Sequence, residues 1–146
     1  MADANDKPIL LIDPAYTNYL SLAQRTSRKT ISLCRTLQED GKFSLPTERE
    51  IDQLVQEYHP SALIIIPYDN PTGQLMSRDD LLMMARLCVR HNMRLISDEA
   101  YRELYYTQGA PLSVRSLNDE IVPGIQGRRI SIETASKVWN ACGLRI

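Results

Sequence analysis

The sequence predicts an α/β fold with a mostly parallel sheet that is covered by helices on both faces. Two observations carry this prediction. Short apolar runs rich in Ile, Leu and Val recur along the chain, and amphipathic helical patterns lie between them. Strands that alternate with helices favour βαβ units, in which helices cover both faces of a parallel sheet. With 146 residues, the chain is long enough for one domain with a substantial core.

Five apolar runs are predicted to be strands. Each has the length of a strand and is bounded by polar or turn-forming residues. In chain order they are PILLID from Pro8, KTISLCR from Lys29, SALIIIP from Ser61, MRLISD from Met93 and RRISIET from Arg128. The run from Lys29 is the weakest of the five, and we expect the other four to be buried.

Three helices are predicted between these strands. The first spans Asn18 to Thr26. The second begins at Thr47, because Glu50 three residues later completes a capping box, and it ends before Pro60.

The third helix begins at Ser77, which forms a similar capping box with Asp80. It ends near residues 91–92. Its apolar stripe is predicted to face the core and comprises Leu81, Met84, Ala85, Cys88 and Val89. Residues 37–46 are predicted to be an exposed loop, and residues 105–127 a long polar connection with room for a short helix.

Charge and composition exclude several classes of partner. The net charge of −1, with 24% charged residues, gives no electrostatic footprint for nucleic acid and no basic helix for an anionic membrane. No apolar stretch reaches the length of a membrane span, and the first residues lack an apolar signal region, so we expect a cytoplasmic protein. Cys34, Cys88 and Cys142 match no zinc spacing and are interpreted as core residues in a reducing compartment. No metal site is predicted.

Chemically capable residues follow four of the predicted strands. Ligands of open α/β sheets bind beyond the carboxyl ends of the strands, so these residues are expected to share one rim. They lie in Asp13–Tyr16, Asn70–Gly73, Asp98–Tyr101 and Thr134–Lys137.

Each of these segments alone has an ordinary interpretation. Residues 70–73 are typical of a turn, Asp98 and Glu99 of a helix cap or solvated edge, and Lys137 of a surface lysine. His59 and His91 lie at predicted helix ends and support neither a catalytic triad nor a metal site. Their conjunction is more specific, because pyridoxal phosphate requires a lysine amine, a carboxylate for its ring nitrogen, donors for its ring oxygen, and hydroxyl and guanidinium groups for its phosphate.

Four motifs resemble those of the class I and II aminotransferases, which are fold-type I pyridoxal-phosphate enzymes. The motifs are DPAYTNY from Asp13, NPTG from Asn70, SDEAYREL from Ser97 and TASKVWNACGLR from Thr134, and they occur in the family's order along nearly the whole chain. The resemblance implies transfer of an amino group between an amino acid and a 2-oxo acid with pyridoxal 5'-phosphate as cofactor. It also implies a homodimer for the full-length enzyme.

The resemblance assigns roles to single residues. Lys137 resembles the lysine that forms the Schiff base and moves the proton, and Asp98 the carboxylate that keeps the pyridine nitrogen protonated. Tyr101 and Asn70 resemble the donors to the ring oxygen.

The phosphate and the ring face have their own counterparts. Thr134 and Arg145 resemble the phosphate ligands, and Ser136, next to the lysine, is a further candidate. Tyr16 resembles the aromatic residue that stacks on the pyridine ring; the alternative is that it packs under the first loop.

Lys137 is expected to differ from the other lysines in its solvation. Lys7, Lys29 and Lys42 lie in a tail, before the weak strand and in a loop, where an amine stays protonated. Lys137 follows a predicted buried strand, so we expect desolvation, together with the cationic Arg145, to favour its neutral, nucleophilic form.

Members of the family are considerably longer than this chain. We therefore expect residues 1–146 to be the central part of the pyridoxal-phosphate-binding large domain, without its N-terminal segment and without the small domain that grips the substrate carboxylate. Two alternatives remain open at this point. One is a lyase or decarboxylase of the same family, and the other is a non-catalytic binding domain that retains the motifs.

Overall fold

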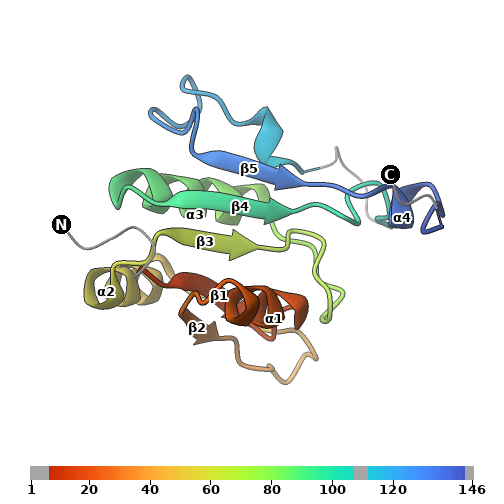
Figure 1. The fold of residues 1–146 in the computed structure, drawn as a ribbon, viewed down its shortest axis with the longest axis horizontal. Coiled ribbons are helices and arrows are strands. Elements are labelled where there is room, and N and C mark those ends of the chain that lie inside the picture. The colour runs from red at the N-terminus through yellow and green to blue at the C-terminus, as the bar shows by residue number, and fades with distance from the viewer. Residues whose placement is uncertain (1–6, 107–111, 144–146) are drawn as a thin grey trace.

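The computed structural model describes residues 7–106 and 112–143, which form a five-stranded parallel sheet with helices against it (Figure 1). The strands pair in the order β2-β1-β3-β4-β5. Their bounds are β1 Ile9–Asp13, β2 Thr30–Cys34, β3 Ala62–Ile65, β4 Arg94–Asp98 and β5 Arg129–Ile132. All five predicted strands are present, and the predicted α/β class is confirmed.

The strand order reverses at β1. From β1 the chain moves outward to β2 and then returns past β1 to β3, β4 and β5. Leu10 of β1 therefore has Ile31 on one side and Leu63 on the other. Because every pair is parallel, all carboxyl ends emerge at one edge of the sheet, and the reversal leaves room for a ligand there.

The three predicted helices are present with bounds within two residues of those expected, and a fourth helix of four residues, which was not predicted, follows the last strand. They are α1 Asn18–Arg25, α2 Glu48–Tyr58, α3 Arg78–Arg90 and α4 Ala135–Val138, together with the short 3-10 helix η1 Val114–Ser116. Both predicted capping boxes are present. In α2 the Thr47 backbone N–H donates to the Glu50 carboxylate over 2.8 Å, and the Glu50 N–H donates back to the Thr47 hydroxyl over 3.3 Å.

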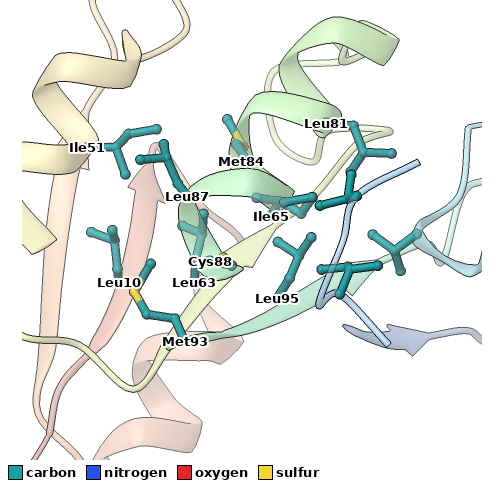
Figure 2. Close-up of a cluster of buried hydrophobic side chains, with 14 of the residues drawn as sticks. Leu10, Ile51, Leu63, Ile65, Leu81, Met84, Leu87, Cys88, Met93 and Leu95 are labelled. Atoms are coloured by element: carbon teal, nitrogen blue, oxygen red, sulfur yellow. The ribbon is translucent and has the colours of Figure 1, made fainter. Parts of the chain in front are cut away.

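The main core lies between α2, α3 and one face of the sheet (Figure 2). We call this face the covered face. The side chains that build it are fully buried because strands and helices both present apolar residues to the same layer. They include Leu10, Leu63, Ile65 and Leu95 from the strands and Ile51, Leu81, Met84, Leu87 and Cys88 from the helices.

The opposite face, which we call the open face, is only partly covered. Tyr19 of α1 packs there with Leu11 and Ile64. Ile130 and Ile132 of β5 remain 46% and 41% exposed. The prediction of a buried strand from Arg128 is therefore wrong for this face. The reason is that β5 is at the edge of the described sheet, and α1 lies over the half of the sheet that contains β1 (Figure 1).

The cysteines also differ from expectation. Cys88 is buried in the main core, whereas Cys34 and Cys142 are exposed. The interpretation as core residues holds for Cys88 alone, because β2 is an edge strand and Cys142 follows the last described helix. Within residues 7–106 and 112–143, no helix combines the length and the hydropathy that a membrane crossing requires.

Candidate active site

Segments that follow four strands surround one hollow of about 690 Å³ at the carboxyl edge of the sheet. We call it the strand-end hollow. It receives side chains from the ends of β1, β3, β4 and β5. The predicted site residues among its lining are Tyr16, Asn70, Asp98, Tyr101, Thr134, Ser136 and Lys137. The eighth predicted residue, Arg145, lies outside the described residues.

Asp98 ends β4 and is held from two directions. One carboxylate oxygen accepts the backbone N–H of Ala100 over 3.1 Å. The other accepts the phenol of Tyr19, which comes from α1. Each oxygen retains a lone pair, so the carboxylate can still accept a further donor from the hollow.

Tyr19 is a residue that the sequence interpretation did not single out. Its phenol is buried, and burial together with the Asp98 carboxylate raises its pKa well above the ordinary value. Tyr19 therefore stays protonated and remains a donor to Asp98 at any physiological pH. Tyr19 and Asp98 are far apart in the sequence, and only the position of Tyr19 as the second tyrosine of the DPAYTNY motif could have indicated a role.

Lys137 and Tyr101 face each other across the hollow. The lysine Nζ lies 5.6 Å from the centroid of the Tyr101 ring. Lys137 is carried by the short helix α4, which Thr134 caps by accepting the N–H of Ser136 over 3.1 Å. The Thr134 hydroxyl hydrogen is still available for a ligand.

The expected desolvation of Lys137 is not found. Its side chain is exposed, as is most of the described part of the segment that follows β5. The expectation was wrong because it took the strand before Lys137 to be buried, whereas β5 is an edge strand of the described sheet and no residue of it is buried. An edge strand with an uncovered face does not bury the residues that follow it.

Tyr16 stands at the mouth of the hollow and is 38% exposed. Its ring meets that of Tyr19 edge to face, with the centroids 6.2 Å apart, and its phenol oxygen accepts the side-chain amide of Asn18 over 2.9 Å. The contact with Tyr19 fixes one edge of the ring, and the hollow leaves other parts of it accessible.

Asn70 belongs to a turn that is anchored from behind. The Gly73 N–H donates to the Asp69 carbonyl over 2.8 Å, and Gly73 has a φ of 72°, which favours glycine. The Asp69 carboxylate accepts the Thr72 hydroxyl and pairs with Arg35 over 2.7 Å. The side chains of Arg35 and Asp69 are 5% and 7% exposed, so this nearly buried pair ties the turn to the end of β2.

The donor set favours one kind of ligand. The predicted site residues in its lining offer an amine, a carboxylate, a phenol, an amide and two hydroxyls, together with the aromatic ring of Tyr16. The volume of the hollow lies within the range of small-molecule sites. In the described part of the chain, no three His, Cys, Asp or Glu side chains are grouped as metal ligands. The hollow is suited to a planar, anionic heterocycle that carries a basic ring nitrogen.

Comparisons with known proteins agree with this geometry. Residues 1–146 match the family model described as aminotransferase class I and II. The chain is 26% identical over 152 residues to kynurenine–oxoglutarate transaminase 1 of Mus musculus, and 25% identical over 139 residues to the cystathionine beta-lyase PatB of Bacillus subtilis. These matches cover 100% and 94% of this chain but 34% of each relative. The chain thus spans about a third of the length of these relatives.

The fold has close counterparts among solved structures. A pyridoxal-phosphate-bound putative aminotransferase from Clostridium difficile 630 superposes with a TM-score of 0.83 at 23% identity. The match covers 99% of this chain and 35% of that one. It shows that both chains share the same arrangement of strands and helices.

Proposed function

The chain belongs to the class I and II aminotransferase family, and we propose that it forms the central part of the cofactor-binding large domain of a pyridoxal-phosphate-dependent aminotransferase. The complete enzyme would transfer an amino group between an amino acid and a 2-oxo acid. As the family resemblance implies, it would act as a homodimer.

One observation carries the proposal: Asp98 and Lys137 come from different strand ends and line the same hollow. A carboxylate for the ring nitrogen and an amine for the aldehyde carbon are, among the groups that this cofactor requires, the two that take part most directly in its chemistry. Because Asp98 and Lys137 line the same hollow, they do not lie on opposite edges of the sheet, which is the arrangement that would contradict the proposal.

Asp98 would set the charge on the cofactor ring. Pyridoxal phosphate supplies an electron sink for the negative charge that develops at the substrate's α-carbon, and the sink is stronger when the ring nitrogen is protonated. The free lone pairs of Asp98 can accept that N–H, and the Tyr19 phenol fixes the orientation of the carboxylate.

Lys137 would hold the cofactor and move the proton. Its amine is the one described lysine amine in the strand-end hollow, where a substrate's α-carbon would be within its reach. The capped first turn of α4 holds the backbone of the lysine close to the Thr134 and Ser136 hydroxyls.

The remaining residues would orient the group. Tyr101 and Asn70 can donate to the ring oxygen, Thr134 and Ser136 to the phosphate, and Tyr16 can stack on the ring. Arg145 would add a bidentate phosphate contact, which the family motif supports.

A lyase of the same family is the second candidate, and the similarity to the Bacillus subtilis cystathionine beta-lyase favours it. The same residues serve both reactions, because in each Asp98 would act on the cofactor's ring nitrogen and Lys137 would move the proton at the substrate's α-carbon. The two differ in products: an amino-group transfer leaves the substrate side chain intact, whereas a β-lyase expels it. Product analysis of the complete enzyme with an aromatic amino acid and with cystathionine separates them.

The site itself is tested on the chain of residues 1–146. We expect borohydride reduction in the presence of pyridoxal phosphate to fix a pyridoxyl group on Lys137, as found by peptide mass mapping. Lys137→Ala should abolish the adduct, whereas the matched control Lys42→Ala, in an exposed loop, should retain it. An adduct on Lys7, Lys29 or Lys42 in the unaltered chain would reject Lys137 and the site.

A further inference from the structure

Two segments of the site alternate between a front and a rear side. After β4, Tyr101 lines the strand-end hollow while the next residue, Arg102, points away from it. After β5, Lys137 lines the strand-end hollow while Glu133 points away from it, and Thr134 lies between the two sides and borders both. Both diverted residues line a second hollow of about 590 Å³, which we call the rear hollow.

Arg102 and Glu133 meet in the rear hollow as a two-pronged ion pair. Nη1 of Arg102 donates to Oε1 of Glu133 over 2.9 Å, and Nη2 donates to Oε2 over 3.2 Å. Parallel bonds of this kind fix direction as well as distance. The pair therefore fixes the orientation of the segment after β5 relative to the segment after β4.

The arginine is also tied to the interior. Its Nη1 donates over 3.2 Å to Glu99, which is 1% exposed and is not the solvated edge that the sequence allowed. Glu99 accepts the Ser113 hydroxyl over 2.6 Å and the Val114 N–H over 2.8 Å. Arg102 thus links the buried carboxylate of Glu99 to the exposed carboxylate of Glu133, and the buried carboxylate holds the arginine side chain in place.

The Arg102–Glu133 ion pair lies past the last backbone hydrogen bond between β4 and β5. The register of β4 and β5 ends at Asp98 and Ile132, and one further bond joins the Glu99 N–H to the Ile132 carbonyl over 2.8 Å. In the described part of the chain, this is the last backbone hydrogen bond between the two segments. Past it, side chains must hold them together.

We propose that Arg102 is a positioning residue of the cofactor site: by gripping Glu99 and Glu133 from behind, it sets the separation between the arm that carries Asp98 and Tyr101 and the arm that carries Thr134 and Lys137. This role rests on the function proposed for the strand-end hollow. Arg102 itself does not line that hollow.

The charge on Glu133 supports this role. Hydrogen bonds from Arg115 and then from Arg102 lower the pKa of Glu133 to about 2, so the carboxylate is charged at every working pH. Arg115 provides a matched control. It bonds Glu133 over 2.9 Å, but it follows β4 by a long connection and is 64% exposed, and the described side chains that bond the Glu99 carboxylate are those of Arg102 and Ser113.

The test compares Arg102→Gln with Arg115→Gln in the chain of residues 1–146 without cofactor. Amide hydrogen exchange, read by mass spectrometry, reports on residues 134–139. We expect exchange in this peptide to rise about tenfold in Arg102→Gln and little in Arg115→Gln, because the Arg102 side chain bonds both Glu99 and Glu133, whereas that of Arg115 bonds Glu133 from a separate segment. Equal rises in both variants, or none in Arg102→Gln, would overturn the proposal.

A second readout is the dissociation constant of pyridoxal phosphate. It should rise about tenfold in Arg102→Gln and stay within twofold in Arg115→Gln. If the unaltered chain does not bind the cofactor, the proposal that residues 1–146 bind it by themselves fails, and the exchange measurement still decides the positioning role. If Arg102→Gln does not fold, Glu133→Gln removes the same pair from its exposed end and should reproduce the rise in exchange.

Discussion

The covered face of the sheet buries its apolar side chains fully, whereas the open face leaves some of them partly exposed and contributes side chains to the strand-end hollow. On the covered face, Leu63, Leu95 and Leu87 are fully buried under two capped helices. On the open face, α1 contributes Tyr19, while Ile130 and Ile132 are left near half exposure. The strand-end hollow lies at the carboxyl edge, and Ile132 of the open face lines it together with Tyr19.

This contrast separates stability from chemistry. The covered face can hold the strands in place because its apolar side chains are close-packed, so each contributes strongly to the free energy of unfolding. The residues that would perform the reaction are exposed or half-buried, and several of them are anchored by single polar contacts. Substitutions on the covered face should therefore alter mainly the free energy of unfolding, and substitutions in the strand-end hollow mainly the chemistry.

The largest expected effect on stability compares Leu95→Ala with Ile130→Ala on neighbouring strands. Leu95 is fully buried, so its truncation should lower the free energy of unfolding by about 2–5 kcal/mol. Ile130 is 46% exposed, and the same measurement should give a loss of about 1 kcal/mol or less. Urea titration of both variants is the check, and similar losses would show that the two faces are not energetically distinct.

A smaller effect is expected where the open face meets the site. Tyr19→Phe removes the phenol that donates to Asp98, and it should cost about 1–2 kcal/mol of unfolding free energy at neutral pH. The pKa of Tyr19 is raised in the folded chain, so this contribution is present below the ordinary tyrosine value of 10.0 and is lost as the pH rises above it. When the free energy of unfolding is measured from pH 7 to 11, the difference between the unaltered chain and Tyr19→Phe should become smaller as the pH rises. A constant difference would argue against the bond to Asp98.

The smallest effect is expected at the rear of the site. Glu133 is 36% exposed, so Glu133→Gln should lower the free energy of unfolding by about 1 kcal/mol or less. Its pKa is lowered from 4.5 to about 2, so the contribution is present above pH 4.5 and is lost as the pH falls toward 2. Thermal unfolding of both chains across this range should bring their midpoints together in acid. Midpoints that instead separate in acid would contradict the ion pair.

The local parts of the fold could be predicted from the sequence because their signals are local. Thr47 with Glu50, and Ser77 with Asp80, define helix starts within four residues. The strand ends could also be placed on one rim, because a parallel sheet sends all its carboxyl ends the same way. The meeting of Asp98 with Lys137 in one hollow follows from that rule.

The contacts that support the site could not be predicted in this way. Tyr19 and Asp98, or Arg102 and Glu133, become neighbours only once the strand order is known. The exposure of Ile132 and Lys137 was missed for a related reason. An alternating apolar run predicts a strand, but its position at the edge of the described sheet is a property of the whole arrangement.

The position of β1 between β2 and β3 also affects the order in which the fold can be completed. β1 leaves the ribosome before β3, and Leu10 must wait for Leu63, roughly fifty residues later, before its second edge is paired. At about 5–20 residues per second, synthesis keeps that edge open for roughly 3–10 s. During this interval β1 of the β1–α1–β2 unit is paired with β2 along one edge, and its other edge is open to pairing with another chain.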